Sequence, residues 1–326
     1  MKKCNIGGQA VIEGVMMRAP SRMAIAVRRS DGDIAVDARE LSSLKDRYPI
    51  LKLPVVRGVI SFIESLTVGI KSLMHSAEMY GDEATLEEYK PSKLERFVAD
   101  KTGKKAEDVM MFFALVLAFG LAVLLFVVFP TMLTGLLKRW IAKRFVLGLI
   151  EGATRLGIFL CYIVLVTRIK DIQRVFEYHG AEHKVIHCYE HGEELNISNA
   201  RKYSTLHPRC GTAFLLVVMV VSIVVFSAIS WDNVVLRMII KILLLPFVAG
   251  VSYEIIRWAG KTSWPGVKVV LFPGLMLQKL TTREPDDDQL EVAIRAFVEA
   301  AGNTGEVDDE AGYDGNPEER MYNSKR

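Results

Sequence analysis

Four long apolar runs constrain this chain more than any other feature of its sequence. They cover about Val109–Phe129, Phe145–Thr167, Gly211–Ser230 and Val234–Trp258. A helix needs roughly 20 mostly apolar residues to cross the hydrocarbon core of a bilayer, and each run is long enough. The sequence therefore predicts an α-helical polytopic membrane protein with about four transmembrane helices.

Ionisable residues interrupt two of these runs. Glu151 and Arg155 lie four positions apart in the second run, the spacing of a helical ion pair. Such residues inside a bilayer are costly and mark function by default, although an interfacial pair that snorkels to the membrane surface is the other interpretation. The fourth run contains Arg237, Lys241 and Pro246, and we expect the proline to kink it.

Composition agrees with a membrane protein and argues against a nucleic-acid partner. Hydrophobic residues make up 51% of the 326 positions, and the formal net charge is only +3. The cysteines form no C-x-x-C pair, which suits a reducing compartment. The first twenty residues lack a long apolar core, so we expect no cleaved signal peptide.

With four spans, residues 1–108, 168–210 and 259–326 lie on one side of the membrane. Most basic residues that flank the runs lie in these segments, and the positive-inside rule then places them in the cytoplasm. The basic cluster Lys138–Arg144 on the opposite side argues the other way. The expected localisation is a multi-pass protein of the cytoplasmic membrane with both termini inside.

Local patterns divide the chain into segments. A turn at Asp31-Gly32 between apolar runs predicts a β-hairpin. From Pro54 to about Met79 apolar residues recur at helical spacing, which predicts an amphipathic helix that does not cross the membrane. The expected segments are a cytoplasmic β-rich part over 1–52, a membrane-associated helix over 53–81, a charged linker over 82–108, a transmembrane bundle over 109–258 with a histidine-rich loop at 168–210, an interfacial segment and helix over 259–301, and a disordered acidic tail over 302–326. The cytoplasmic N-terminal portion is thus expected to be α+β.

Five of the six histidines fall between residues 179 and 207. His179 and His183 are one helical turn apart, so both imidazoles can face the same side of a helix and form half of a zinc site. Glu182 completes the order H-x-x-E-H, in which the carboxylate can act as general base on a metal-bound water. Alternatively, Glu182 could pair with Lys184 or Arg209, or orient a ligand histidine.

His207 and Cys210 form a second cluster directly before the third run. An imidazole and a thiolate three residues apart are good zinc ligands, and Pro208 between them predicts a rigid turn. In the structural alternative Cys210 is a small buried apolar residue and His207 a capping group. The predicted site is therefore His179, His183, His207 and Cys210 around zinc or a similar divalent transition metal.

Other polar residues are weaker candidates. Glu190 flanks the helical face that also carries His187 and His191, although a solvent-facing stripe explains these histidines as well. Glu254, near the end of the fourth run, could supply a distant carboxylate ligand. Gly7–Arg18 could present Glu13 and Arg18 from a tight loop, but a glycine-bearing entry into a strand is the simpler interpretation.

Gly7–Arg18, Tyr178–Lys184, His207–Thr212 and Lys279–Asp288 resemble the signature segments of the YqhQ-like family, a bacterial membrane family with a domain of unknown function. The resemblance covers roughly residues 4 to 300. It implies a bacterial membrane protein, and the family's label of predicted metal-dependent enzyme rests on these same residues. His187 and His191 lie outside the motif, which weakens their claim as ligands.

Three functions remain open at this stage. The leading one is a metal-dependent hydrolase at the cytoplasmic membrane face, which requires one of the four ligands not to bind, because a catalytic zinc keeps an open position. The second is a membrane adaptor or regulator with a structural metal that binds another membrane protein. The third is a transporter or metal sensor that uses Glu151 and Arg155. The lipid bilayer is the one partner common to all three.

Overall fold

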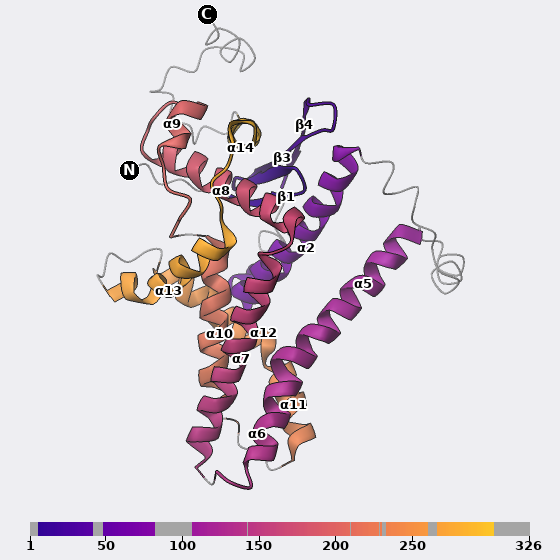
Figure 1. Ribbon diagram of the computed structural model, residues 1–326, viewed down its shortest axis with the longest axis vertical. Helices are drawn as coiled ribbons and strands as arrows, with labels where there is room; N and C mark the ends of the chain where they lie inside the picture. The colour runs from indigo at the N-terminus through magenta and orange to yellow at the C-terminus, as the bar shows by residue number, and fades with distance from the viewer. Residues whose placement is uncertain are drawn as a thin grey trace, which may run out of the picture.

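The computed structural model of the protein describes residues 6–41, 48–81, 106–141, 143–208, 210–227, 229, 233–259 and 266–302. Figure 1 shows two regions, a head that holds a small sheet with its covering helices and a stalk of long helices that extends away from it. The predicted linker over 82–108 and the acidic tail over 302–326 fall almost wholly outside the described residues.

The head contains a four-stranded antiparallel meander in the order β1-β2-β3-β4. The strands are β1 (Gly7–Val11), β2 (Gly14–Arg18), β3 (Arg22–Arg28) and β4 (Ile34–Glu40). The predicted hairpin around Asp31-Gly32 is confirmed as β3 and β4, with Gly32 at φ 95°. The segment Gly7–Arg18 forms a further hairpin, whose two-residue turn places Glu13 at φ 49°.

Both faces of the sheet are covered, which explains why β2 and β3 are almost wholly buried. On one face, Val15 and Ala24 pack with two helices, α8 (Lys170–Glu190) and α14 (Asp287–Ala301). On the other face, Met16 and Ile25 pack against α2 (Val56–Tyr80). Successive side chains of a strand point to opposite faces, so the alternating residues of one strand serve two separate cores.

The predicted amphipathic helix is confirmed as α2, preceded by the short helix η1 (Pro49–Lys52). Its buried positions are small residues, and large apolar side chains such as Ile63 and Leu66 are more than half exposed. A Cβ on Gly58 would lie 2.8 Å from the carbonyl oxygen of Gly250, so α2 approaches the stalk helix α12 (Leu245–Ala259) closely. Helix α2 thus connects the sheet to the stalk.

Two helices are long and apolar enough to cross a membrane. The first runs over Met111–Leu137 through α5 (Ala106–Val123), η2 (Leu124–Val128) and α6 (Phe129–Leu137). The second covers Val146–Val166 within α7 (Arg144–Val166). Both of the corresponding predicted spans are confirmed as helices, and they indicate a membrane protein.

The other two predicted spans are less regular. Helix α10 (Gly211–Ser227) is apolar but has only 17 residues. The fourth run is divided into α11 (Val234–Leu243) and α12, which meet at 44°. Pro246 lies in the first turn of α12, where it lacks the N–H that would continue the preceding helix. Counting the bent pair as one span gives up to three spans in the described residues, so the expected four are not reached.

Three further helices complete the head and its connection to the stalk. They are α9 (Ile197–Arg201), α13 (Gly266–Thr281) and α14. Asp286 caps α14 and forms a reciprocal capping box with Gln289, as its run of three aspartates suggests. Helix α8 ends before Gly192, which has φ 74°.

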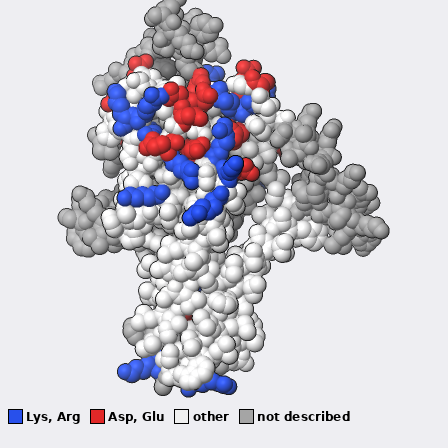
Figure 2. All heavy atoms as spheres, in the orientation of Figure 1, with Lys and Arg blue, Asp and Glu red and all other residues white. Residues whose placement is uncertain are grey.

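Charge divides the molecule in the same way as the fold. On the face shown in Figure 2, acidic and basic side chains gather over the head, and the stalk is bare until basic side chains appear at its far end. The connection between α6 and α7 carries exposed Lys138, Arg139 and Lys143. An uncharged band between two charged ends is the pattern that a bilayer requires.

Candidate metal centre

Helix α8 presents the histidines of the predicted site, and it lies against the C-terminal segment at close range. A Cβ on Gly180 would lie 2.0 Å from the carbonyl oxygen of Arg283, so only glycine fits between His179 and Ala181. The amide of Arg283 donates to the carbonyl of Phe176 at 3.0 Å. The glycine in the motif therefore lets the chain beyond α13 pass directly over the helix.

His179, His183 and Cys210 come together as predicted. One possible ligand atom from each lies within 4.8 Å of the others, and we call these residues the thiolate group. The Nε2 atom of His179 is 3.1 Å from the Sγ atom of Cys210, and the two imidazole rings are 4.5 Å apart. The turn over 207–210, closed by the amide of Cys210 on the carbonyl of His207 at 3.3 Å, brings the thiol to the helix.

Backbone carbonyls fix how the two imidazoles of the thiolate group are oriented. The Nδ1 atom of His179 donates to the carbonyl of Thr281 at 2.8 Å, and that of His183 donates to the carbonyl of Thr205. A carbonyl can only accept, so the proton sits on Nδ1 and Nε2 keeps its lone pair. The Nε2 atom of His183 is buried and has no hydrogen-bond partner among the described residues. Histidines that bind metals are held in this way.

A second set of possible ligands lies one turn further along α8. His187, Glu190 and His207 each offer an atom within 4.8 Å of the others, and we call them the carboxylate group. The Nε2 atom of His207 is 3.5 Å from Oε2 of Glu190. The sequence predicts His207 with the thiolate group, but its ring centroid is 5.6 Å from that of His183 and 4.6 Å from that of His187.

The turn before Cys210 explains why His207 lies with the carboxylate group. Gln278 on α13 accepts from the amide of His207 and donates to its carbonyl, both at 2.8 Å. These two bonds hold the backbone of His207 so that its ring reaches Glu190. His187 also helps to place His207, because its Nε2 atom donates to the carbonyl of the preceding residue, Leu206, at 2.9 Å. The interpretation of His187 as part of a solvent-facing stripe is therefore wrong, whereas His191 is exposed.

Burial favours the neutral form of the two histidines in the carboxylate group. Burial lowers the pKa of His187 and of His207, and for His187 the neighbouring histidines lower it further. A neutral imidazole has a lone pair to donate, and metal binding is favoured when ligands need not lose a proton. Both groups thus fit a divalent first-row metal, the thiolate group with N and S donors and the carboxylate group with N and O donors.

Glu182 lies beside the thiolate group and is held from the sheet. Its Oε1 atom accepts from the amide of Gly8 on β1 at 2.9 Å, and its Oε2 atom is 4.0 Å from Nε2 of His179. A Cβ on Gly8 would lie 2.9 Å from Cγ of Glu182, so this glycine is needed for the contact. Lys184 is bonded instead to the carbonyls of residues 201 and 203 and to Glu284.

The N-terminal candidates have structural partners. Glu13, in the turn between β1 and β2, pairs with Arg174 and accepts from the hydroxyl of Tyr178 at 3.3 Å, so it fixes the turn to α8. Arg18 ends β2 opposite Gly7 and Met23. The interpretation of Gly7–Arg18 as a glycine-bearing strand entry is confirmed, with the addition that Gly8 supports Glu182.

Glu254 is not positioned as a metal ligand. Both of its carboxylate oxygens accept from the guanidinium of Arg57, with Nε at 2.6 Å. This two-point ion pair joins α2 to α12 beside the close contact of Gly58 and Gly250. Its role is to hold the helix that covers the sheet against the stalk.

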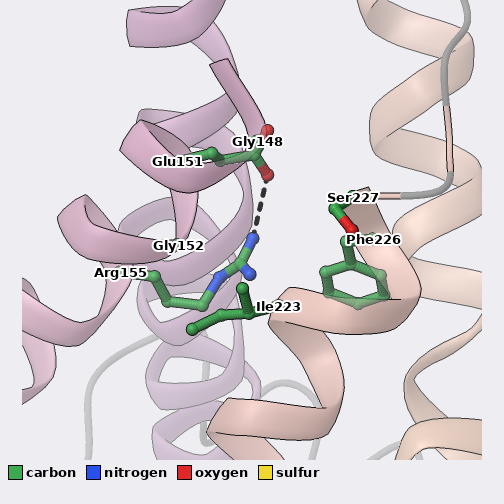
Figure 3. A pocket seen from close by; sticks show the side chains of 7 residues that line it. All are labelled: Gly148, Glu151, Gly152, Arg155, Ile223, Phe226 and Ser227. Carbon is green, nitrogen blue, oxygen red and sulfur yellow. Dashed lines mark hydrogen bonds and ion pairs between the residues drawn. The ribbon is translucent and has the colours of Figure 1, made fainter. Parts of the chain in front are cut away.

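Glu151 and Arg155 form the predicted ion pair, and it is buried in the stalk. Figure 3 shows the pair on α7 facing Ile223, Phe226 and Ser227 of α10. The Nη2 atom of Arg155 is 3.0 Å from Oε1 of Glu151, and Lys241 of α11 pairs with the same carboxylate. The pair does not snorkel, because Glu151 and Arg155 are 8% and 4% exposed as residues, and Lys241 is fully buried. We call Glu151, Arg155 and Lys241 the span cluster.

The span cluster is satisfied by its own surroundings. The Nε atom of Arg155 donates to the carbonyl of Phe126 at 2.8 Å, and Lys241 donates to the hydroxyl of Thr131 at 3.1 Å. Thr134 adds a hydroxyl 3.5 Å from Glu151. Lys241 was not a candidate from sequence, although an ionisable residue in an apolar run is the signal that singled out Glu151 and Arg155.

Comparison with known proteins agrees with the expected family. Residues 53–303 match the family model "Protein of unknown function (DUF1385)". The chain is 35% identical to "Uncharacterized protein YqhQ" of Bacillus subtilis (strain 168) over 298 residues, which is 90% of this chain and 91% of that protein. No solved structure matches the chain.

Proposed function

We propose that this chain, which belongs to the DUF1385 family of proteins of unknown function, is a membrane-bound zinc hydrolase. The observation that carries the proposal is the thiolate group with Glu182 beside it. Three protein ligands leave the fourth position of a tetrahedral zinc open for water, and the nearest carboxylate is already fixed at the ligand His179.

The roles of the residues follow from their contacts. His179, His183 and Cys210 would hold the metal, and the metal would lower the pKa of a bound water to about 7. Glu182 would accept the proton of that water through Oε2, because Oε1 is occupied by the amide of Gly8. The proton would then pass to the leaving group of the substrate, as general acid–base catalysis requires.

Burial of the ligands supports an alternative. His183 is 1% exposed and the neighbouring Glu182 is 5% exposed, whereas His179 and Cys210 are half-buried. A metal there would join α8 to the turn directly before α10, which suits a structural tie in an adaptor that binds another membrane protein. The span cluster, whose charges are paired, supports a transporter less well.

Two substitutions separate the enzyme from the structural site. His183→Ala should lower zinc content and thermal stability in either case. Glu182→Gln keeps the shape and the bond from Gly8, so the variant should keep zinc and fold but lose cellular complementation, because a general base contributes about 10²–10⁴-fold in rate. Zinc content, melting temperature and complementation are measured together. Glu182→Gln with normal zinc and full complementation would leave only the structural function.

The orientation in the membrane belongs to the same proposal. We place the head in the cytoplasm and the α6–α7 connection outside, with α10 and the bent pair α11–α12 as further spans. Single added cysteines in a background that keeps Cys210 as its one natural cysteine should report this, with the parent background as the labelling control. Gly32→Cys in the β3–β4 turn should react only after the membrane is permeabilised, and Arg139→Cys should react in intact cells. The reverse pattern would place the head on the exterior.

A further inference from the structure

The carboxylate group is a second set of metal ligands that the proposed hydrolase does not use. Its three members come from two segments, with His187 and Glu190 on α8 and His207 on the turn that Gln278 holds. Glu190 is 2% exposed and His207 is 4% exposed.

The orientation of His187 points to a ligand. Its Nε2 atom donates to the carbonyl of Leu206 at 2.9 Å, which leaves the lone pair on Nδ1. That Nδ1 atom is buried and has no hydrogen-bond partner among the described residues. The same arrangement, with one ring nitrogen on a backbone carbonyl and the other left over, occurs at His183 in the thiolate group.

We propose that His187, Glu190 and His207 bind a second divalent transition metal, next to the metal of the thiolate group. Two imidazoles and one carboxylate form a donor set that suits iron(II), manganese(II) or zinc and leaves coordination positions open. The two groups lie side by side on α8, since the His183 and His207 rings are 5.6 Å apart. The head would thus hold two metals in neighbouring sites of different donor chemistry.

The stoichiometry of zinc tests this on the full chain in detergent. Protein stripped of metal and reloaded with zinc should hold two equivalents after dialysis, measured by elemental mass spectrometry. His187→Ala and the shape-conserving Glu190→Gln should each hold one, and Cys210→Ser should also hold one. His191→Ala is the matched control, because His191 is an exposed histidine directly after α8. This variant should hold two equivalents of zinc. Circular dichroism and size exclusion establish that each variant is folded.

Cobalt distinguishes the two sites from each other. With cobalt(II), the thiolate-to-metal charge-transfer band should persist in His187→Ala and disappear in Cys210→Ser. One zinc equivalent in the wild type that is lost in Cys210→Ser, or loss of the band in His187→Ala, would overturn the second site. A wild type that holds one zinc on Cys210 would leave the proposed hydrolase intact, and a wild type that holds one zinc insensitive to Cys210→Ser would remove the hydrolase site instead.

Discussion

The head and the stalk each bury a cluster of polar side chains, and the two clusters differ in whether they are complete. In the span cluster, the carboxylate of Glu151 meets both Arg155 and Lys241, and neighbouring hydroxyls and a carbonyl take the remaining donors. In the head, backbone carbonyls take one nitrogen of each α8 ligand histidine, and the other nitrogens of His183 and His187 are left over. A complete cluster stabilises helices, whereas an incomplete one has room for a ligand.

The largest expected effect is on the complete cluster. Glu151→Ala removes the carboxylate between two buried cations, and breaking a buried ion pair in this way costs about 3–5 kcal/mol. The free energy of unfolding in detergent should therefore fall strongly. The zinc content per folded chain should stay at the wild-type value. Glu151→Gln, which keeps the volume, serves as the control for packing. Loss of zinc in folded Glu151→Ala would show that the two clusters are coupled.

A smaller effect should follow metal removal from the incomplete cluster. A ligand that binds only the folded state stabilises it by about 2.7 kcal/mol at a concentration 100 times its Kd. Chelation should therefore lower the melting temperature of the wild type and of Glu151→Gln, and should lower that of His183→Ala by less, because only the carboxylate group can still hold a metal there. Differential scanning fluorimetry in detergent measures the shift. Equal melting temperatures with and without chelator in the wild type would mean that the thiolate and carboxylate groups, like the span cluster, need no ligand for stability.

The smallest effect concerns the residue that positions His207. Gln278→Leu removes both bonds to the backbone of His207, and a supporting contact of this kind contributes about 10–100-fold to metal affinity. Zinc titration of this variant should show a lower affinity of the carboxylate group for zinc. The charge-transfer band of cobalt bound to the thiolate group should be unchanged. Thr281→Val is the matched control, because it keeps the backbone carbonyl that holds His179. Equal weakening in both variants would point to a general loosening of α13.

Local patterns in the sequence predicted the elements that carry the site. The β3–β4 hairpin and helix α2 both depend on neighbouring residues. The pairing of His179 with His183 follows from the same local spacing, because they are one turn apart, whereas Cys210 comes from the turn before α10. The division of the fourth run at Pro246 was also accessible, since proline acts on its own helix.

Contacts between distant segments could not be predicted in this way. His207 lies with Glu190 because Gln278 holds its backbone from 71 residues away, and no spacing rule relates these positions. The carbonyls that orient His179 and His183 belong to Thr281 and Thr205, and every residue type has a carbonyl. The amide of Gly8 at Glu182 is hidden from sequence for the same reason.

The bond from His179 to the carbonyl of Thr281 has a consequence for the order in which the protein is made. The ribosome synthesises Thr281 102 residues after His179, when every apolar run has already been translated. Until then His179 has no acceptor to fix its tautomer, and the chain that passes over Gly180 does not yet exist. A nascent chain therefore cannot assemble the predicted centre before Thr281 is made, and a metal that needs the oriented His179 would bind only after all of the apolar runs have been synthesised.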